Sequence, residues 1–319
     1  MERKGTGQFY TPSDIVQYII SHLPIKSDSK ILDPACGCGS FLLGLFDTLR
    51  IKYGVSALKN LYGVDLNPDA INITRFSLFV KSGCNKKYLK PLRENIRFGN
   101  SIVTNTSFDK NGFNWNDNFA SVMSDGGFDY VVGNPPYVTL DHNQFDLSET
   151  NYSNIINGST NAASLMIMRS ISLLKKDGML AFLLPKSILY VHSYDLLRKF
   201  ILDNARILQI FDLGQKFPDV RGEQIILILQ KRKPRINDEQ TLIKILKNKD
   251  KPLFEQPSFK IKHNLLNTIN NFLALDSATY YKIIKNLKDE NQTLGDLVDE
   301  KIFRGIPIGA NSPKISKTP

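Results

Sequence analysis

Short apolar runs rich in β-branched residues alternate with segments of helical periodicity over most of this chain. The runs that we expect to form strands are residues 30–33, 61–65, 95–99, 128–133, 178–184, 207–213 and 224–230. Helical patterns lie between them, at residues 13–23, 40–52, 68–81, 162–176 and 193–204. Strands that alternate with helices are typical of α/β proteins, in which helices cover both faces of a largely parallel sheet. The sequence therefore predicts a doubly wound, seven-stranded sheet with a Rossmann-like topology.

The composition is that of an ordinary globular protein, with 42% hydrophobic and 23% charged residues among 319. No run of about 18 apolar residues is present, and the first residues lack the apolar stretch of a signal peptide. Three cysteines do not make a disulfide framework, so we expect a cytoplasmic protein. Cys36 and Cys38 are close enough to suggest a metal site, but no second Cys or His pair complements them. The four histidines show no metal-ligand spacing, so we expect no metal.

The net charge of +10 favours a polyanionic partner. Most of the excess lies towards the C-terminus, where residues 231–319 carry 17 Lys and Arg against 10 Asp and Glu. The sequence there is also rich in Lys, Asn and Ile and has only weak hydrophobic periodicity. We therefore divide the chain into a catalytic domain at 1–235, a basic extension at 236–292 and the start of a further region at 293–319.

The first predicted strand leads into a turn that contains two glycines, Gly37 and Gly39, ahead of a helical segment. In open α/β sheets, ligands bind beyond the carboxyl ends of the strands, where glycines let the backbone approach the ligand. The third glycine of the dinucleotide fingerprint is missing, which argues against a nicotinamide or flavin cofactor. The sequence thus predicts a cofactor loop at residues 33–41.

Two further strands end in polar residues that would face the same crevice. Asp65 ends the second strand, where a carboxylate suits the two hydroxyls of a ribose. The alternative for Asp65 is an Asx turn at the start of the following helix. Asn100 follows the third strand and is expected near an adenine edge; the alternative is an ordinary loop residue.

The fourth strand is followed by Asn134, Pro135, Pro136 and Tyr137. Each proline removes an N–H donor and holds the preceding residue extended, so the loop presents acceptors with few competing donors. The Asn134 side-chain oxygen and a backbone carbonyl can accept both protons of an NH2 group and aim its lone pair at an incoming methyl group. Tyr137 offers an aromatic face to a planar base.

A base inside a duplex must be flipped out to reach such a pocket, and a second aromatic face would help to hold it. Phe217, between the sixth and seventh predicted strands, is the candidate. The alternative is an ordinary core or loop-anchoring phenylalanine.

These motifs, in this order and with Gly7-Gln8-Phe9-Tyr10-Thr11-Pro12 ahead of them, resemble the gamma-type N6-adenine DNA methyltransferases of restriction–modification systems, relatives of type IIG and type I modification enzymes. The resemblance covers roughly residues 5–230. It implies a class I methyltransferase fold with a short C-terminal extension, and methyl transfer to N6 of a flipped-out adenine in double-stranded DNA. The implied catalytic residues are Asn134, Pro135, Pro136 and Tyr137, with Tyr137 and Phe217 stacking on the base. The implied cofactor is S-adenosyl-L-methionine, bound by Tyr10, Thr11, Asp33, Ala35, Gly37, Gly39, Phe41, Asp65, Leu66, Asn100, Ser101 and Asn134.

The sequence departs from this family at three places. An Asp is more usual at position 100, and aromatic residues are often found where Asn161–Met166 stands. Residues 293–311 resemble the opening of a target-recognition domain, but the chain ends before that domain could form. We therefore expect a specificity domain or subunit to be supplied in trans or lost by truncation.

Three other functions remain open from the sequence. A protein glutamine methyltransferase also uses Asn-Pro-Pro-Tyr to hold a planar amide. A cytosine N4 methyltransferase would present an amine that fits the same acceptors. A cofactor-binding assembly subunit without activity of its own is the alternative outside enzymes.

Overall fold

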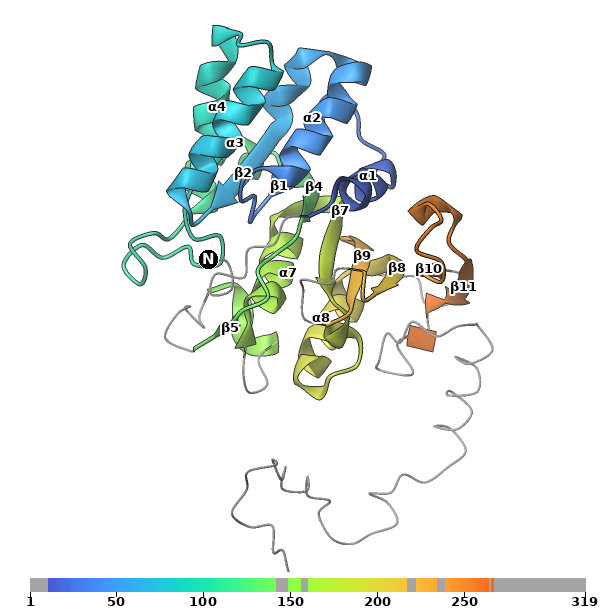
Figure 1. Ribbon diagram of the computed structural model, residues 1–319. Helices are drawn as coiled ribbons and strands as arrows, with labels where there is room; N and C mark the ends of the chain where they lie inside the picture. Colours follow the sequence, from blue (N-terminus) through green and yellow to red (C-terminus); the bar gives the residue numbers. More distant parts are fainter. Residues whose placement is uncertain are drawn as a thin grey trace, which may run out of the picture.

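A sheet of nine strands forms the centre of the computed structural model, which describes residues 11–141, 149–155, 160–216, 222–233, 239–263 and 265–266 (Figure 1). The strand order is β11-β10-β8-β9-β7-β4-β1-β2-β3. The strands are β1 (Ile31–Asp33), β2 (Leu61–Asp65), β3 (Ile96–Phe98), β4 (Phe128–Gly133), β7 (Leu174–Pro185), β8 (Arg206–Gly214), β9 (Gln224–Gln230), β10 (Gln240–Ile245) and β11 (Ser258–Lys262). The helices are α1 (Ser13–Ser21), α2 (Ser40–Tyr53), α3 (Pro68–Lys81), α4 (Leu89–Asn95), α5 (Trp115–Asn118), α6 (Ala120–Ser124), α7 (Ala162–Leu173) and α8 (Asp195–Asn204).

Helices cover both faces of the sheet, as Figure 1 shows for α2–α4 on one side and α7 and α8 on the other. The side chains of each central strand alternate between two hydrophobic cores. Ile31 of β1 packs with α1–α4, whereas Leu32 beside it packs with α5–α8. This period of two is what a strand buried on both faces requires. The predicted α/β architecture is confirmed.

Strands β1, β2, β3, β4 and β7 run parallel, so their carboxyl ends meet at one edge of the sheet, which we call the carboxyl edge. Strand β9 runs antiparallel between β7 and β8, which makes the sheet mixed. Its apolar run Ile225–Leu229 is buried on both faces. The carboxyl edge is where an open α/β sheet binds ligands.

The prediction of seven strands was wrong, because β10 and β11 extend the sheet beyond β8. Both lie in the segment 236–292 that the sequence assigns to an extension. Strand β10 escaped detection because its buried positions include polar residues: Thr241 donates to the Ile207 carbonyl at 2.8 Å, and Lys244 donates to the Phe254 carbonyl at 2.7 Å. The sheet thus continues beyond residue 235, where the sequence predicts the end of the catalytic domain. The division of the chain into three parts stays a prediction. The last part, 293–319, lies outside the described residues.

Two polar segments for which the sequence predicts neither a strand nor a helix, residues 104–127 and 139–161, contain ordered structure. Helices α5 and α6 lie within 104–127, where Trp115 and Phe119 pack against each other in the core. Within 139–161, β5 (Thr139–Leu140) pairs antiparallel with β6 (Thr160–Asn161) directly after the Asn-Pro-Pro-Tyr loop. The apolar side chains of these segments are separated by asparagines, so their hydrophobic periodicity is too weak to predict such short elements.

Among the helices of the described ranges, none is both long and apolar enough to cross a membrane.

We predict that β10 is an integral strand of the fold, which Ile243→Ala tests. Ile243 is 0% exposed, and its truncation should lower the free energy of unfolding by about 2–5 kcal/mol through lost burial and a residual cavity. The measurement is urea denaturation followed by circular dichroism. Ile51→Ala is the matched control, because Ile51 of α2 is 86% exposed and its loss should change stability by less than about 0.5 kcal/mol. An Ile243→Ala variant as stable as the control would contradict the prediction.

Candidate active site

The carboxyl edge brings together the loops that follow β1, β2 and β4. Strand β1 lies between the other two, with Ile31 opposite both Leu61 of β2 and Tyr130 of β4. Residues far apart in the sequence, Asp33, Asp65 and Asn134, therefore leave the sheet side by side. The three predicted motifs thus lie together at the carboxyl edge.

The loop between β1 and α2 is fixed by its two glycines. Gly37 and Gly39 have φ angles of +49° and +88°, which residues with a side chain rarely adopt. A Cβ at Gly39 would also lie 2.9 Å from the Thr74 side chain. The Thr74 hydroxyl donates to the Gly37 carbonyl at 2.8 Å. Helix α3 therefore holds the loop close against the start of α2.

Asp65 binds two backbone amides on different loops. The N–H of Gly37 donates to Oδ2 at 2.7 Å, and the N–H of Asn67 donates to Oδ1 at 2.8 Å. The second bond is the Asx turn considered from the sequence, and Asn67 also caps α3. Each carboxylate oxygen has a second lone pair, so the predicted ribose contact stays possible beside this structural role.

Asp33 is 2% exposed and lies beneath the cofactor loop, where its Oδ1 accepts from the Ala35 N–H at 3.1 Å. Glycine is required opposite it, because a Cβ at Gly133 would lie 2.8 Å from Asp33 Oδ1. Burial raises the pKa of Asp33 to about 8, and the negative charge of Asp65 adds to the rise. Asp33 thus supports the loop from below.

A cavity of about 530 Å³ opens beside these loops. It brings together three residues predicted for the cofactor or the catalytic loop: Leu66, Asn100 and Pro136. The complete lining is Leu66, Asn100, Ile102, Phe108, Asp109, Lys110, Pro136, Val138, Leu140 and Ala162.

The Asn100 amide already has partners. Its Oδ1 accepts from the Ile102 N–H at 3.1 Å, and its Nδ2 donates to Asp109 Oδ2 at 2.8 Å. The other Asp109 oxygen accepts from the Asn111 N–H at 2.9 Å. Asp109 and the neighbouring Phe108, 43% exposed, were missed from the sequence because 104–127 reads as a polar loop. An aromatic residue followed by an acid within that loop was the available signal.

The Asn134 side chain is held in one orientation by hydrogen bonds at both ends. Its Nδ2 donates to Thr11 Oγ1 at 3.2 Å, and its Oδ1 accepts from the Tyr137 hydroxyl at 2.6 Å. The Tyr137 hydroxyl also lies 3.0 Å from the Leu183 carbonyl oxygen of β7. Burial raises the pKa of Tyr137, so this hydroxyl stays protonated and remains a donor.

The other predicted residues are placed in different ways. Ser101 donates to the Pro34 carbonyl at 2.5 Å and so ties the third loop to the first. Phe41 is 2% exposed within the core of α1–α4, where packing accounts for it. Ala35 and Pro136 are partly exposed, and Pro135 is buried. Tyr10 and Phe217 lie outside the described residues.

No group of three or more His, Cys, Asp or Glu side chains within the described ranges is placed to hold a metal ion.

Comparison with known families identifies the domain. Residues 59–217 match the family described as Eco57I restriction-modification methylase. The chain contains an Eco57I restriction-modification methylase domain. The matched residues of this methylase domain run from just before β2 to just after β8.

Two relatives of the methylase domain are much longer proteins. The type II restriction enzyme and methyltransferase RM.Eco57I of Escherichia coli is 26% identical over 375 residues, covering 96% of this chain and 36% of the relative. The adenine-specific methyltransferase PglX of Streptomyces coelicolor is 30% identical over 184 residues, covering 43% of this chain and 15% of the relative. The chain thus spans only a minor part of either relative.

Solved structures show the same fold. The DrdV–DNA complex matches with a TM-score of 0.60 at 18% identity, covering 81% of this chain and 31% of that one. A protein of Listeria monocytogenes described as a class I S-adenosylmethionine-dependent methyltransferase matches with a TM-score of 0.50 at 20% identity, covering 72% of this chain and 64% of that one. The methylase domain therefore has a class I methyltransferase-like fold with a mixed sheet.

The buried Asp33 predicts a specific dependence of stability on pH. The native carboxyl keeps its proton up to a pKa of about 8, whereas the unfolded chain loses it near 3.8. Between these values the native state binds more protons, so the contribution of Asp33 makes stability fall as pH rises, by up to about 1.4 kcal/mol per pH unit. Asp33→Asn should remove this contribution. Urea denaturation of both proteins at pH 5, 6, 7 and 8 measures it, and identical slopes would show that Asp33 titrates normally.

Proposed function

We propose that this chain is the catalytic part of a DNA methyltransferase that transfers a methyl group from S-adenosyl-L-methionine to N6 of an adenine flipped out of the duplex. The observation that carries the proposal is the Asn134 amide, held between Thr11 and Tyr137 at the carboxyl end of β4. The methylase domain and the adenine-specific relative support the same reading.

The cofactor fits the loops of the carboxyl edge. We assign the methionine part to Thr11 and the loop around Gly37, and the ribose hydroxyls to the free lone pairs of Asp65. The adenine would enter the 530 Å³ cavity between Leu66 and Pro136, beside Asn100. When bound, the cofactor would supply a methyl group on a sulfonium. The bond from nitrogen to the methyl carbon would form as the carbon–sulfur bond breaks, with S-adenosylhomocysteine as the leaving group, and the methylated amine would then lose one proton to solvent.

Asn134 and Pro135 would hold the target amine. A carbonyl oxygen has two lone pairs, so Asn134 Oδ1 can accept from the amine while it still accepts from Tyr137. With the Pro135 carbonyl as second acceptor, both amine protons are bound and the nitrogen lone pair faces the methyl group. Alignment of this kind supplies most of the rate of such a displacement.

Tyr137 and Phe217 are proposed to stack on the flipped adenine from its two sides. Sequence-specific recognition requires further surface, since a specific interface buries about 1,000 Å² or more of protein. We therefore propose double-stranded DNA as substrate and a target-recognition domain or subunit as partner. RM.Eco57I, of which this chain covers 36%, is long enough to contain such a domain.

The proposal predicts that Asn134→Ala cuts the single-turnover rate of methyl transfer to DNA by about a hundredfold, the effect of losing one preorganised transition-state contact. Cofactor affinity, measured by calorimetry, should change little. Tritium transfer from labelled cofactor followed by nucleoside analysis gives the rate and identifies the product. Methylated cytosine or protein in place of N6-methyladenine would overturn the assignment.

Tyr137→Phe is the informative companion variant, because it keeps the ring and removes the hydroxyl that orients Asn134. Loss of one hydrogen bond of about 1.4 kcal/mol should slow methyl transfer by about tenfold. Extrusion of the base, reported by 2-aminopurine fluorescence at the target position, should be unaffected. Tyr137→Ala should impair both.

Asp109 is proposed to recognise the cofactor adenine through its exocyclic amine. Asn100 and the Asn111 N–H each occupy one lone pair of its carboxylate and thereby orient it towards the cavity. Phe108 in the same lining offers an aromatic face to the base. Asp109 and Phe108 would together make the contact to the cofactor adenine that the resemblance assigns to an Asp at position 100.

We predict that wild-type protein prefers S-adenosylhomocysteine over S-inosylhomocysteine, whose carbonyl oxygen replaces the amine and would face the Asp109 carboxylate. Asp109→Asn places a donor there and should reduce this preference by tenfold or more. A change of this size corresponds to one hydrogen bond to a charged group, about 1.5–3 kcal/mol. Calorimetry with both ligands measures the ratio. An unchanged ratio would remove Asp109 from adenine recognition, and Asp117→Asn in α5, outside the cavity lining, serves as the control.

A further inference from the structure

Strands β8 and β10 run parallel as neighbours and end together at the carboxyl edge, with Asp212 opposite Ile245. The segment that contains Lys216 follows β8. The segment 246–251, which we call the lysine loop, follows β10, and its Leu246 N–H donates to the Asp212 carbonyl at 2.8 Å. The lysine loop is thus placed on the same edge of the sheet as the proposed methyl-transfer site.

A buried glutamine gives the lysine loop a fixed shape. Gln256 is 4% exposed, and its Oε1 accepts from the N–H groups of Lys247 and Asn248 at 3.1 and 3.2 Å. Its Nε2 donates to the carbonyls of Asn248 and Lys251 at 2.5 and 3.1 Å. A side chain that satisfies four backbone groups of one exposed loop preorganises that loop, so binding there costs less ordering entropy.

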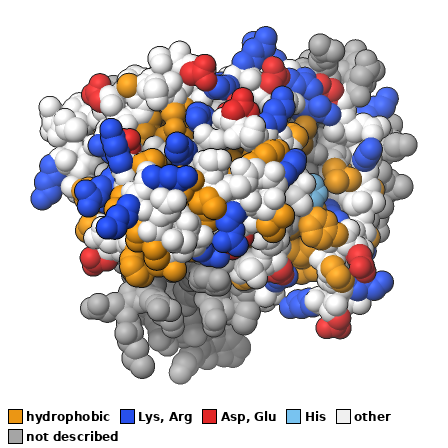
Figure 2. Space-filling model, turned by 90° about the horizontal axis from the view of Figure 1, so that it is seen from above, with side chains coloured by type: hydrophobic (Ala, Val, Ile, Leu, Met, Phe, Trp, Pro, Cys, Tyr) orange, Lys and Arg blue, Asp and Glu red, His pale blue; other side chains and the backbone are white. Residues whose placement is uncertain are grey.

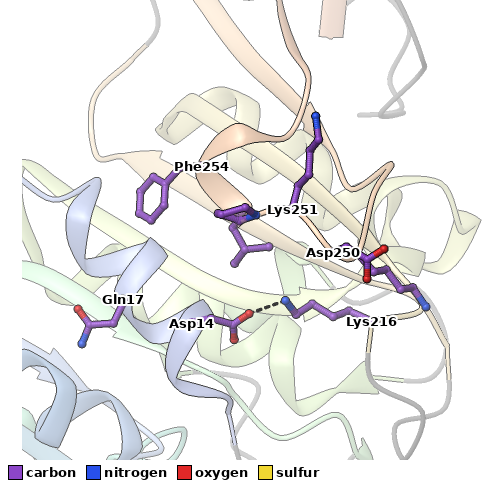
Figure 3. Close-up of a pocket in the computed structure, with 9 residues that line it drawn as sticks. Asp14, Gln17, Lys216, Asp250, Lys251 and Phe254 are labelled. Carbon is purple, nitrogen blue, oxygen red and sulfur yellow. Dashed lines mark hydrogen bonds and ion pairs between the residues drawn. The ribbon is translucent and has the colours of Figure 1, made fainter.

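Three residues of this loop, Lys249, Asp250 and Lys251, border a hollow of about 370 Å³ together with Lys216, Asp14 and Phe254 (Figure 3). Asp14 forms an ion pair with Lys216, as the dashed line in Figure 3 shows. Lys249 donates to the uncharged Gln215 carbonyl at 3.2 Å. No carboxylate of the described ranges forms an ion pair with Lys249 or Lys251. Their charges are therefore available to an anion.

Charge alone does not single out this loop. Lys and Arg side chains also spread over the end of the molecule that Figure 2 views from above, where α2–α4 lie in Figure 1. Lys86 and Lys87, in the short helix that follows α3, are also exposed. What distinguishes the lysine loop is its fixed backbone and its place at the carboxyl edge, next to the segment that leads to Phe217.

We propose that the lysine loop binds the phosphodiester backbone of DNA beside the flipped base, through Lys249 and Lys251. The proposal rests on the DNA methyltransferase function proposed above. Phosphate contacts of this kind fix the position of the duplex and carry no sequence information. They make binding dependent on salt, because each neutralised phosphate releases bound counterions.

The test compares two double variants of the full chain that remove the same charge: Lys249→Gln/Lys251→Gln, and the control Lys86→Gln/Lys87→Gln. Binding to a fluorescent 30-base-pair duplex is measured by anisotropy from 50 to 200 mM salt, with S-adenosylhomocysteine present. The loop variant should reduce the slope of log Kd against log salt by about 1–2, near 0.9 for each lost phosphate contact. The control should keep the wild-type slope, and both should bind S-adenosylhomocysteine normally.

Two results would count against the proposal in different ways. Equal slopes for both double variants would mean that the lysine loop has no special part in DNA binding, while the methyltransferase function could still hold. Failure of the wild-type chain to bind duplex at any salt, with normal binding of S-adenosylhomocysteine, would contradict the choice of DNA as substrate. Gln256→Ala is an independent test of the fixed loop shape. The variant keeps every lysine but loses the side chain that orders the loop, so it should weaken binding at low salt and leave the slope of log Kd against log salt unchanged.

Discussion

Parallel pairing of β1 with both β2 and β4 is the constraint on which the proposed site depends. A parallel sheet places all carboxyl ends at one edge, and a shift of register by one residue would turn every side chain to the opposite face. Asp33, Asp65 and Asn134 stand at or just after these strand ends. The apolar alternation that fills the two cores therefore also fixes the relative positions of the cofactor loop and the Asn-Pro-Pro-Tyr loop.

Two buried carboxylates then set the shape of the loops. Asp65 accepts from the backbone of two loops, and Asp33 supports the first of them from beneath. Burial raises the pKa of both groups, with hydrogen bonds from backbone N–H groups acting in the opposite direction. Asp33 therefore keeps its proton to a higher pH than an ordinary carboxyl, and it can accept from the loop backbone without an unpaired buried charge.

The sequence was sufficient for the central strands and for placing the glycine loop and the Asn-Pro-Pro-Tyr loop at strand ends, because apolar runs, glycines and prolines act locally. It was insufficient where tertiary contacts decide. Strand β10 buries Thr241 and Lys244, whose polar atoms are satisfied by carbonyls that no local pattern reveals. Asp109 reaches the cavity through a hydrogen bond to Asn100, nine residues earlier, in a segment whose asparagines suggested only a loop. Phe41 was predicted at the cofactor; its side chain packs in the core of α1–α4, and a contact with the cofactor stays a prediction.

Two residues of the Asn-Pro-Pro-Tyr loop, Asn134 and Tyr137, are hydrogen bonded to each other, and Asn134 is also bonded to Thr11, which precedes the whole sheet. Thr11 accepts from the Asn134 amide nitrogen, so the amide oxygen must face Tyr137 and the site. An aspartate at position 134 could still accept from the Thr11 hydroxyl, but it would bring a charge into a half-buried loop. An alanine would leave the Tyr137 hydroxyl with only the Leu183 carbonyl as acceptor. The requirement for an amide at this position thus follows from its two neighbours as well as from the amine that we propose it binds.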